Sequence, residues 1–166
     1  LMEKLIAGYG GDEQVTKWLD TLEIYLVPVV NVDGHNIVTS GHDPRWRKNV
    51  RDVNGDGITG VYPEGVDVNR GYSFNWAMGG TNDPSGSSYR GPYPFSQAEN
   101  RAMRALADAR QLLLSVSYHS QGEVIYYPWI WGKMKSPDHK VIERIASDVA
   151  GQITKMNGSG TYAIAP

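Results

Sequence analysis

Three segments carry apolar side chains at the spacing of a helix. The first follows Asp12, a typical N-cap residue, and the second follows the capping-box pattern of residues 96–99 and reaches Arg110. The third is bracketed by Ser136 in front and Gly158 behind, as helices often are. Its predicted apolar face consists of Val141, Ile145, Val149 and Ile153.

Three other segments are continuous apolar and β-branched runs, at residues 22–31, 112–119 and 123–129. Such runs predict strands that are buried on both faces. Together with the helices they indicate an α/β protein, with a central, mostly parallel or mixed twisted sheet and helices on both faces. In such sheets, chemistry lies beyond the carboxyl ends of the strands, here residues 31–34 and 119–121.

Residues 33–94 carry turn dipeptides and little periodicity, and a loop region of that length is more often functional than idle. The 166 residues suit one domain, and the absence of cysteine excludes a disulfide scaffold and thiolate zinc sites. A net charge of -2 argues against a nucleic-acid partner. The longest apolar stretch is too short for a membrane span.

Three features could carry chemistry. His119, at the end of a predicted strand, is either a metal ligand or acid–base group, or a core histidine bonded to a carbonyl. The cations of residues 45–48 form either a solvated face or a fixed guanidinium that stabilises an oxyanion. Asn69 and Arg70 have the same two interpretations, a solvated face or bidentate recognition of a carboxylate.

Residues 52–57 resemble the first half of a calcium loop, with Asp52, Asn54 and Asp56 at ligand positions and glycine at the sixth. The twelfth position is Pro63 instead of glutamate, so an ordinary Asx-rich turn is the alternative interpretation.

Six short motifs follow one another in an order that resembles the zinc carboxypeptidases of the carboxypeptidase A and T family. The Trp-Arg-Lys and Asp-x-Asn-Arg motifs are the specific ones. The motifs lie at residues 29–34, 45–48, 65–70, 89–91, 96–99 and 119–120. The resemblance implies a phosphorylase/hydrolase-like zinc carboxypeptidase architecture, a zinc cofactor, and a peptide substrate with a free carboxylate.

The resemblance also implies residue roles. His119 matches a zinc ligand, and Arg47 matches the arginine that polarises the scissile carbonyl and stabilises the oxyanion. Asn69 and Arg70 match the pair that grips the terminal carboxylate of the substrate. Asp67 matches a carboxylate that orients a zinc-bound histidine.

Two parts of the family pattern are missing. No His-x-x-Glu occurs in the sequence, and no glutamate in a suitable context follows His119. Residues 1–166 are therefore expected to be a partial catalytic domain, incomplete at both ends and inactive alone. The resemblance also implies a secreted or periplasmic location.

Two alternatives stay open. Gln121 replaces an aromatic residue of many family members, and residues 118–123 also resemble the branch that cleaves cell-wall peptides at D-glutamyl or diaminopimelate linkages. The other alternative is a binding module without zinc, which either keeps the carboxylate-gripping pair or is stabilised by calcium.

Overall fold

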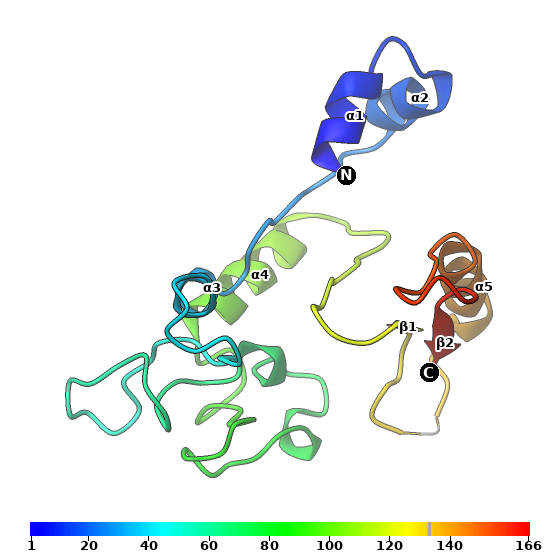
Figure 1. The fold of residues 1–166 in the computed structure, drawn as a ribbon. Helices are drawn as coiled ribbons and strands as arrows, with labels where there is room; N and C mark the ends of the chain where they lie inside the picture. Colours follow the sequence, from blue (N-terminus) through cyan, green and yellow to red (C-terminus); the bar gives the residue numbers. More distant parts are fainter. Residues whose placement is uncertain (133) are drawn as a thin grey trace. The chain divides into compact units, whose positions relative to one another are not determined.

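The computed structural model describes residues 1–132 and 134–166 and divides into two compact units. The first unit comprises Leu1–Phe74 and Gly80–Ala105, and the second comprises Asn75–Gly79 and Leu106–Pro166. Helices and a small parallel sheet make up the regular structure (Figure 1). In these described ranges no helix is long and apolar enough to cross a membrane.

The first unit opens with two short helices that pack side by side, α1 (Met2–Gly8) and α2 (Glu13–Thr21) (Figure 1). The Asp12 carboxylate accepts hydrogen bonds from the amides of Gln14 and Val15, which confirms Asp12 as the predicted N-cap. Val15 is buried against α1, where Gly8 leaves room for its side chain.

A helix that the sequence did not predict, α3 (Val32–Thr39), follows. Asn31 caps it by accepting from the Gly34 amide, and the Asn31 amide group donates to the Lys48 carbonyl at 3.0 Å. A Cβ at position 34 would lie 2.6 Å from the Lys48 carbonyl oxygen and 2.2 Å from the Asn31 amide nitrogen. Glycine at this position therefore allows the helix to approach the loop that holds Arg47.

Three further helical segments lie between α3 and residue 110. Two are single 3-10 turns, η1 (Val68–Arg70) and η2 (Trp76–Met78). The third, α4 (Ala98–Ala109), confirms the predicted helix after the capping-box pattern. Residues 33–94 otherwise consist of turns and irregular segments, as predicted.

The second unit contains a two-stranded parallel sheet of β1 (Val124–Tyr126) and β2 (Ala163–Ala165), with Ile125 opposite Ile164. Helix α5 (His139–Ala150) packs against both strands (Figure 1). This helix begins after Asp138 and ends well before Gly158. Its buried residues are Ala146 and Ala150, so the predicted apolar face was wrong: Val141 and Val149 are exposed.

Two of the three predicted strands were also wrong. Residues 22–31 and 112–119 form no strand, and their side chains are largely exposed, with Leu26 at 40% and Leu113 at 93%. An extended segment becomes a strand only when a neighbouring strand pairs with its amides and carbonyls. The described residues place no such neighbour beside either segment.

Candidate functional site

An ion pair in the first unit joins Arg47 to Asp67. The guanidinium donates from Nε and Nη2 to Asp67 Oδ2, at 3.1 and 2.6 Å. Asp67 is 2% exposed, whereas the Arg47 side chain is 47% exposed. The buried carboxylate therefore fixes one edge of a guanidinium that is otherwise free to meet solvent or a ligand.

The other oxygen of Asp67 organises the η1 turn. Oδ1 accepts from the Asn69 amide at 3.1 Å, so Asp67 caps the turn that carries Asn69 and Arg70. Gly71 closes the turn by donating its amide to the Val68 carbonyl. One carboxylate thus connects the two sequence motifs that we expected to bind the oxyanion and the substrate carboxylate.

Backbone contacts hold these two motifs together. The Asn49 amide donates to the Val66 carbonyl at 2.9 Å, and the Val66 amide donates to Asn49 Oδ1 at 2.8 Å. Gly65 adds a bond to the Arg51 carbonyl, and its φ of +89° favours glycine. A Cβ there would lie 2.2 Å from the Asn49 carbonyl oxygen, so the close approach also requires glycine.

Lys48 is fully buried, although the cations of residues 45–48 could have formed a solvated face. Its ammonium donates to the carbonyls of Pro63 and Pro84, at 2.7 and 3.1 Å. The rings of Tyr62 and Tyr89 lie 5.4 and 5.9 Å from the charge. Burial lowers the pKa of Lys48, and the nearby carboxylate of Glu64 opposes that shift.

The segment at the start of α4 supports the same site from a distant part of the sequence. The side-chain amide of Asn49 donates to Gln97 Oε1 at 3.0 Å and to Glu99 Oε1 at 3.1 Å. Glu99 was predicted to serve a capping box, but its carboxylate accepts from Asn49. Asn100, fully buried, donates to the Val68 carbonyl at 2.9 Å. Sequence reasoning found none of these contacts, because they join residues about 30 to 50 positions apart.

Arg70 lies half-buried and Asn69 is exposed. The Arg70 guanidinium donates to the Asn69 carbonyl at 3.0 Å, and this bond holds the Arg70 side chain next to the backbone of Asn69. The stem of Arg70 runs past Gly80, where a Cβ would lie 3.1 Å from Arg70 Cγ. A guanidinium next to a carboxamide can present several N–H donors to one carboxylate.

His119 lies in the second unit, whereas Arg47, Asp67, Asn69 and Arg70 lie in the first. It is exposed and belongs to the unpaired segment 112–119. In the described part of the chain, no group of three or more His, Cys, Asp or Glu side chains could hold a metal ion. The predicted role of His119 as a zinc ligand and that of Asp67 beside a zinc-bound histidine stay predictions.

In the loop with the calcium-like pattern, the side-chain oxygens accept hydrogen bonds from backbone amides of the same loop. Asp52 accepts from the amides of Gly55 and Gly57, at 2.6 and 2.9 Å. Asn54 accepts from the Asp56 amide, and Asp56 accepts from the Ile58 amide. The backbone hydrogen bonds from Gly57 and Gly55 lower the pKa of Asp52. The loop is an Asx-rich turn, and the structure gives the calcium prediction no support.

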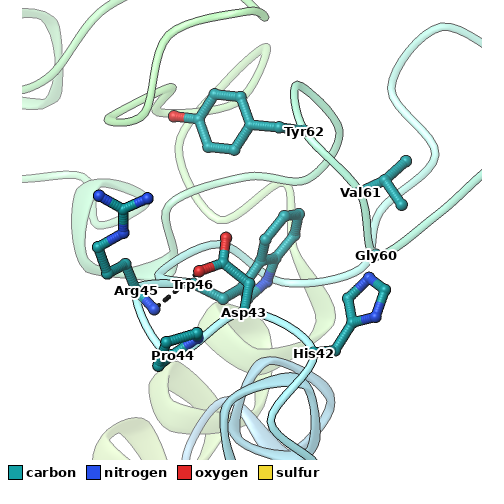
Figure 2. A pocket seen from close by; sticks show the side chains of 8 residues that line it. All are labelled: His42, Asp43, Pro44, Arg45, Trp46, Gly60, Val61 and Tyr62. Atoms are coloured by element: carbon teal, nitrogen blue, oxygen red, sulfur yellow. Dashed lines mark hydrogen bonds between the residues drawn. The ribbon is translucent and has the colours of Figure 1, made fainter.

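A shallow pocket of about 410 Å³ lies beside the Trp-Arg-Lys motif (Figure 2). The Trp46 and Tyr62 rings meet edge to face in it, with centroids 6.1 Å apart. The Arg45 amide donates to Asp43 Oδ1, as Figure 2 shows. Arg47 does not line this pocket. The pocket is therefore separate from the Arg47–Asp67 pair.

Comparison with known proteins explains the ordered motifs. A family model described as zinc carboxypeptidase matches residues 1–165. Carboxypeptidase A2 of Rattus norvegicus is 27% identical over 165 residues, which is 98% of this chain and 38% of the relative. Mast cell carboxypeptidase A of Homo sapiens is 30% identical over 142 residues, covering 83% of this chain and 32% of that protein.

The fold agrees with this assignment. The crystal structure of thrombin activatable fibrinolysis inhibitor superposes with a TM-score of 0.81 and 25% identity, covering 98% of this chain and 40% of that one. This likeness confirms the predicted α/β class. Both carboxypeptidase A2 and this inhibitor match nearly all of the chain, but the chain spans only about two fifths of the length of each of them. With the family model covering almost every residue and the ordered motifs in place, the chain belongs to the zinc carboxypeptidase family.

Proposed function

We propose that this chain supplies the oxyanion and carboxylate-binding part of a metallocarboxypeptidase, which hydrolyses a peptide bond next to a free carboxylate. The observation that carries the proposal is the double use of Asp67, which holds Arg47 with one oxygen and caps the turn of Asn69 and Arg70 with the other. A reaction that stabilises an oxyanion and recognises an adjacent carboxylate needs cations held at a fixed spacing.

Each residue has a defined task in this proposal. Arg47 keeps a half-exposed guanidinium whose remaining N–H groups can donate to the oxygen that becomes an oxyanion. Arg70, with Asn69, binds the terminal carboxylate and penalises substrates that lack it. When bound, zinc would polarise the carbonyl and activate water. Of its expected ligands this chain offers His119 alone, so we derive no step through the metal.

The chain alone is proposed to bind a carboxylate ligand without turning over a peptide. A binding module that keeps the carboxylate-gripping pair and has no zinc is the competing function. The observation that favours it is that the contacts that position Asn69 and Arg70 lie within the first unit and involve no metal ligand. Sequencing the gene on both sides of this region distinguishes the two, because a His-x-x-Glu segment in the same reading frame supports the enzyme.

The carboxylate-binding part of the proposal can be tested on the chain itself. N-acetyl-L-phenylalanine and its primary amide differ only in the carboxylate, and ¹⁵N NMR titration gives a Kd for each. We expect the acid to bind more tightly, and Arg70→Gln to remove that preference. Arg45→Gln is the matched control, since Arg45 is an exposed arginine of the neighbouring motif. Equal affinity for acid and amide in the wild-type chain contradicts the proposal.

The enzymatic part needs a separate test. The isolated chain, incubated with zinc and a C-terminally blocked or free dipeptide, is expected to release no amino acid. Chelator-sensitive hydrolysis by the isolated chain would show that it carries a complete catalytic site. A secreted or periplasmic location and the choice between carboxypeptidase and cell-wall substrates belong to the same proposal. Hydrolysis of a panel that includes D-glutamyl peptides by the full-length protein tests the substrate choice.

A further inference from the structure

We propose that Asn100, in the first turn of α4, is a positioning residue for the Asn69–Arg70 pair, an inference that rests on the proposed carboxylate-binding function. Asn100 is separated from this pair by about 30 positions in the sequence, and it belongs to none of the motifs that resemble the family. Its side chain nevertheless contacts the backbone immediately before and immediately after Asn69 and Arg70.

The contact before the pair is a hydrogen bond. Asn100 is fully buried, and its Nδ2 donates to the Val68 carbonyl at 2.9 Å. The same carbonyl accepts the Gly71 amide at 3.2 Å, which closes the η1 turn. Asn100 therefore bonds to the acceptor of one of the two backbone bonds that define this turn, the other being the bond from the Arg70 amide to the Asp67 carbonyl at 2.9 Å. Its Oδ1 is buried with no hydrogen-bond partner among the described residues, and burying a polar atom without a partner costs folding free energy.

The contact after the pair is steric. A Cβ on Gly71 would lie 2.3 Å from Asn100 Oδ1 and 2.8 Å from its Cγ. Gly71 has a φ of -90°, which any residue adopts, so the backbone conformation does not require glycine here. What requires glycine is the Asn100 side chain. The Gly71 carbonyl also accepts from the Phe95 amide at 2.7 Å, which holds this end of the turn against the segment before α4.

These contacts matter for binding because a 3-10 turn of three residues is weak by itself. Asp67 holds the turn through the Asn69 amide, and Asn100 holds it through its contacts with Val68 and Gly71. The directions of the Asn69 and Arg70 side chains follow from that backbone. A carboxylate held by several N–H donors tolerates only a small displacement of those donors. A change at Asn100 should therefore weaken carboxylate binding more than it disturbs the rest of the unit.

The steric contact provides a way to separate positioning from packing. Gly71→Ala introduces a methyl group against Asn100 and should destabilise the chain. Asn100→Ala removes the atoms that the methyl group would meet. The double variant, Gly71→Ala with Asn100→Ala, should therefore recover much of the stability lost in Gly71→Ala. It still lacks the hydrogen bond to the Val68 carbonyl, so it should not recover carboxylate affinity.

The experiment uses the 166-residue chain, with N-acetyl-L-phenylalanine and its primary amide as probes. Kd values come from ¹⁵N NMR titration and stability from urea unfolding, under conditions where each variant is folded. We expect Asn100→Ala and the double variant to bind the acid about tenfold more weakly than wild type, while the weak binding of the amide is unchanged. Val15→Ala, a buried truncation in α2, is the control that lowers stability and leaves acid affinity unchanged.

The outcomes are distinguishable. If the double variant regains both stability and acid affinity, Asn100 only fills space and the inference is wrong. If Asn100→Ala itself unfolds, the double variant supplies the same comparison. If the wild-type chain does not prefer the acid over the amide, the proposed carboxylate-binding function fails first, and the inference fails with it.

Discussion

Asp67 is almost completely buried, yet Arg47, its ion-pair partner at 2.6 Å, remains half-exposed. The pair is therefore asymmetric: removing the arginine leaves a buried charge, whereas removing the carboxylate leaves a guanidinium that water can still reach. An arginine held in this way keeps its orientation without losing access to a ligand. This arrangement suits a cation that must meet a developing oxyanion.

The first prediction follows from that asymmetry. Arg47→Ala should destabilise the chain by about 2–4 kcal/mol, because among the described residues the Asp67 carboxylate then keeps only the Asn69 amide as a hydrogen-bond donor. Asp67→Asn should cost less, about 1–2 kcal/mol, since Arg47 can turn to solvent. Urea unfolding measures both values. The reverse order would show that the buried carboxylate does not depend on Arg47.

The second prediction concerns pH. Burial holds the pKa of Lys48 below its ordinary value of 10.5, so the unfolded chain binds a proton more tightly at this residue than the folded chain. Its contribution to stability therefore increases as the pH rises from the folded pKa to 10.5, and is fully present above 10.5. Burial raises the pKa of Tyr72 above 10.0, which acts in the opposite direction at alkaline pH.

Because these effects overlap, the informative quantity is the difference between the unfolding free energies of wild type and Lys48→Met as a function of pH. We expect this difference to change in favour of wild type as the pH approaches 10.5, and to be flat near neutral pH. Lys135→Met, in which a half-exposed lysine is replaced, is the control with no such trend. A flat difference throughout would show that Lys48 is not buried in solution.

Several local features could be predicted from the sequence, because they depend on neighbouring residues. Asp12 caps α2 through amides two and three positions away, and the start of α4 follows its own local pattern. The end of α5 could not be predicted from Gly158. The chain leaves the helix at Gly151, and Gly158 belongs to the turn that brings Thr154 opposite Thr161.

The long-range part of the site was not predictable in the same way. Arg47, Asn69 and Arg70 were identified by motif, but a charge run does not reveal that Lys48 bonds to carbonyls 15 and 36 positions away. Likewise, the apolar run of residues 22–31 indicates a buried strand, but a strand also requires a partner. Sequence periodicity reports how apolar a segment is and does not supply that partner.

The third prediction tests the close approach at Gly65 against a matched glycine. Gly65→Ala must adopt a φ of +89° and place its Cβ 2.2 Å from the Asn49 carbonyl oxygen. Gly10→Ala has a similar φ of +79° but no atom within 4 Å. We expect about 1 kcal/mol of destabilisation at Gly10, from the backbone alone, and at least about 3 kcal/mol at Gly65. Equal losses would mean that residues 49 and 65 are not in contact.

The fourth prediction concerns metal ions. Because Asp52, Asn54 and Asp56 accept backbone amides within their own loop, calcium should leave the melting temperature of the chain unchanged. Thermal unfolding in millimolar calcium, compared with magnesium at the same ionic strength, measures this. A saturable rise with calcium that Asp56→Ala abolishes would restore the calcium site that the sequence pattern suggested.

The fifth prediction arises from the unpaired apolar segment at residues 112–119. Leu113, Leu114 and Val116 are 93%, 58% and 64% exposed, and an exposed apolar segment promotes association between chains. Sedimentation velocity should show concentration-dependent self-association of the 166-residue chain. Leu114→Lys with Val116→Lys should reduce it, because charges oppose edge-to-edge pairing. Met156→Lys, at an even more exposed apolar residue elsewhere in the second unit, should not. A strictly monomeric wild-type chain would show that this segment is covered in solution.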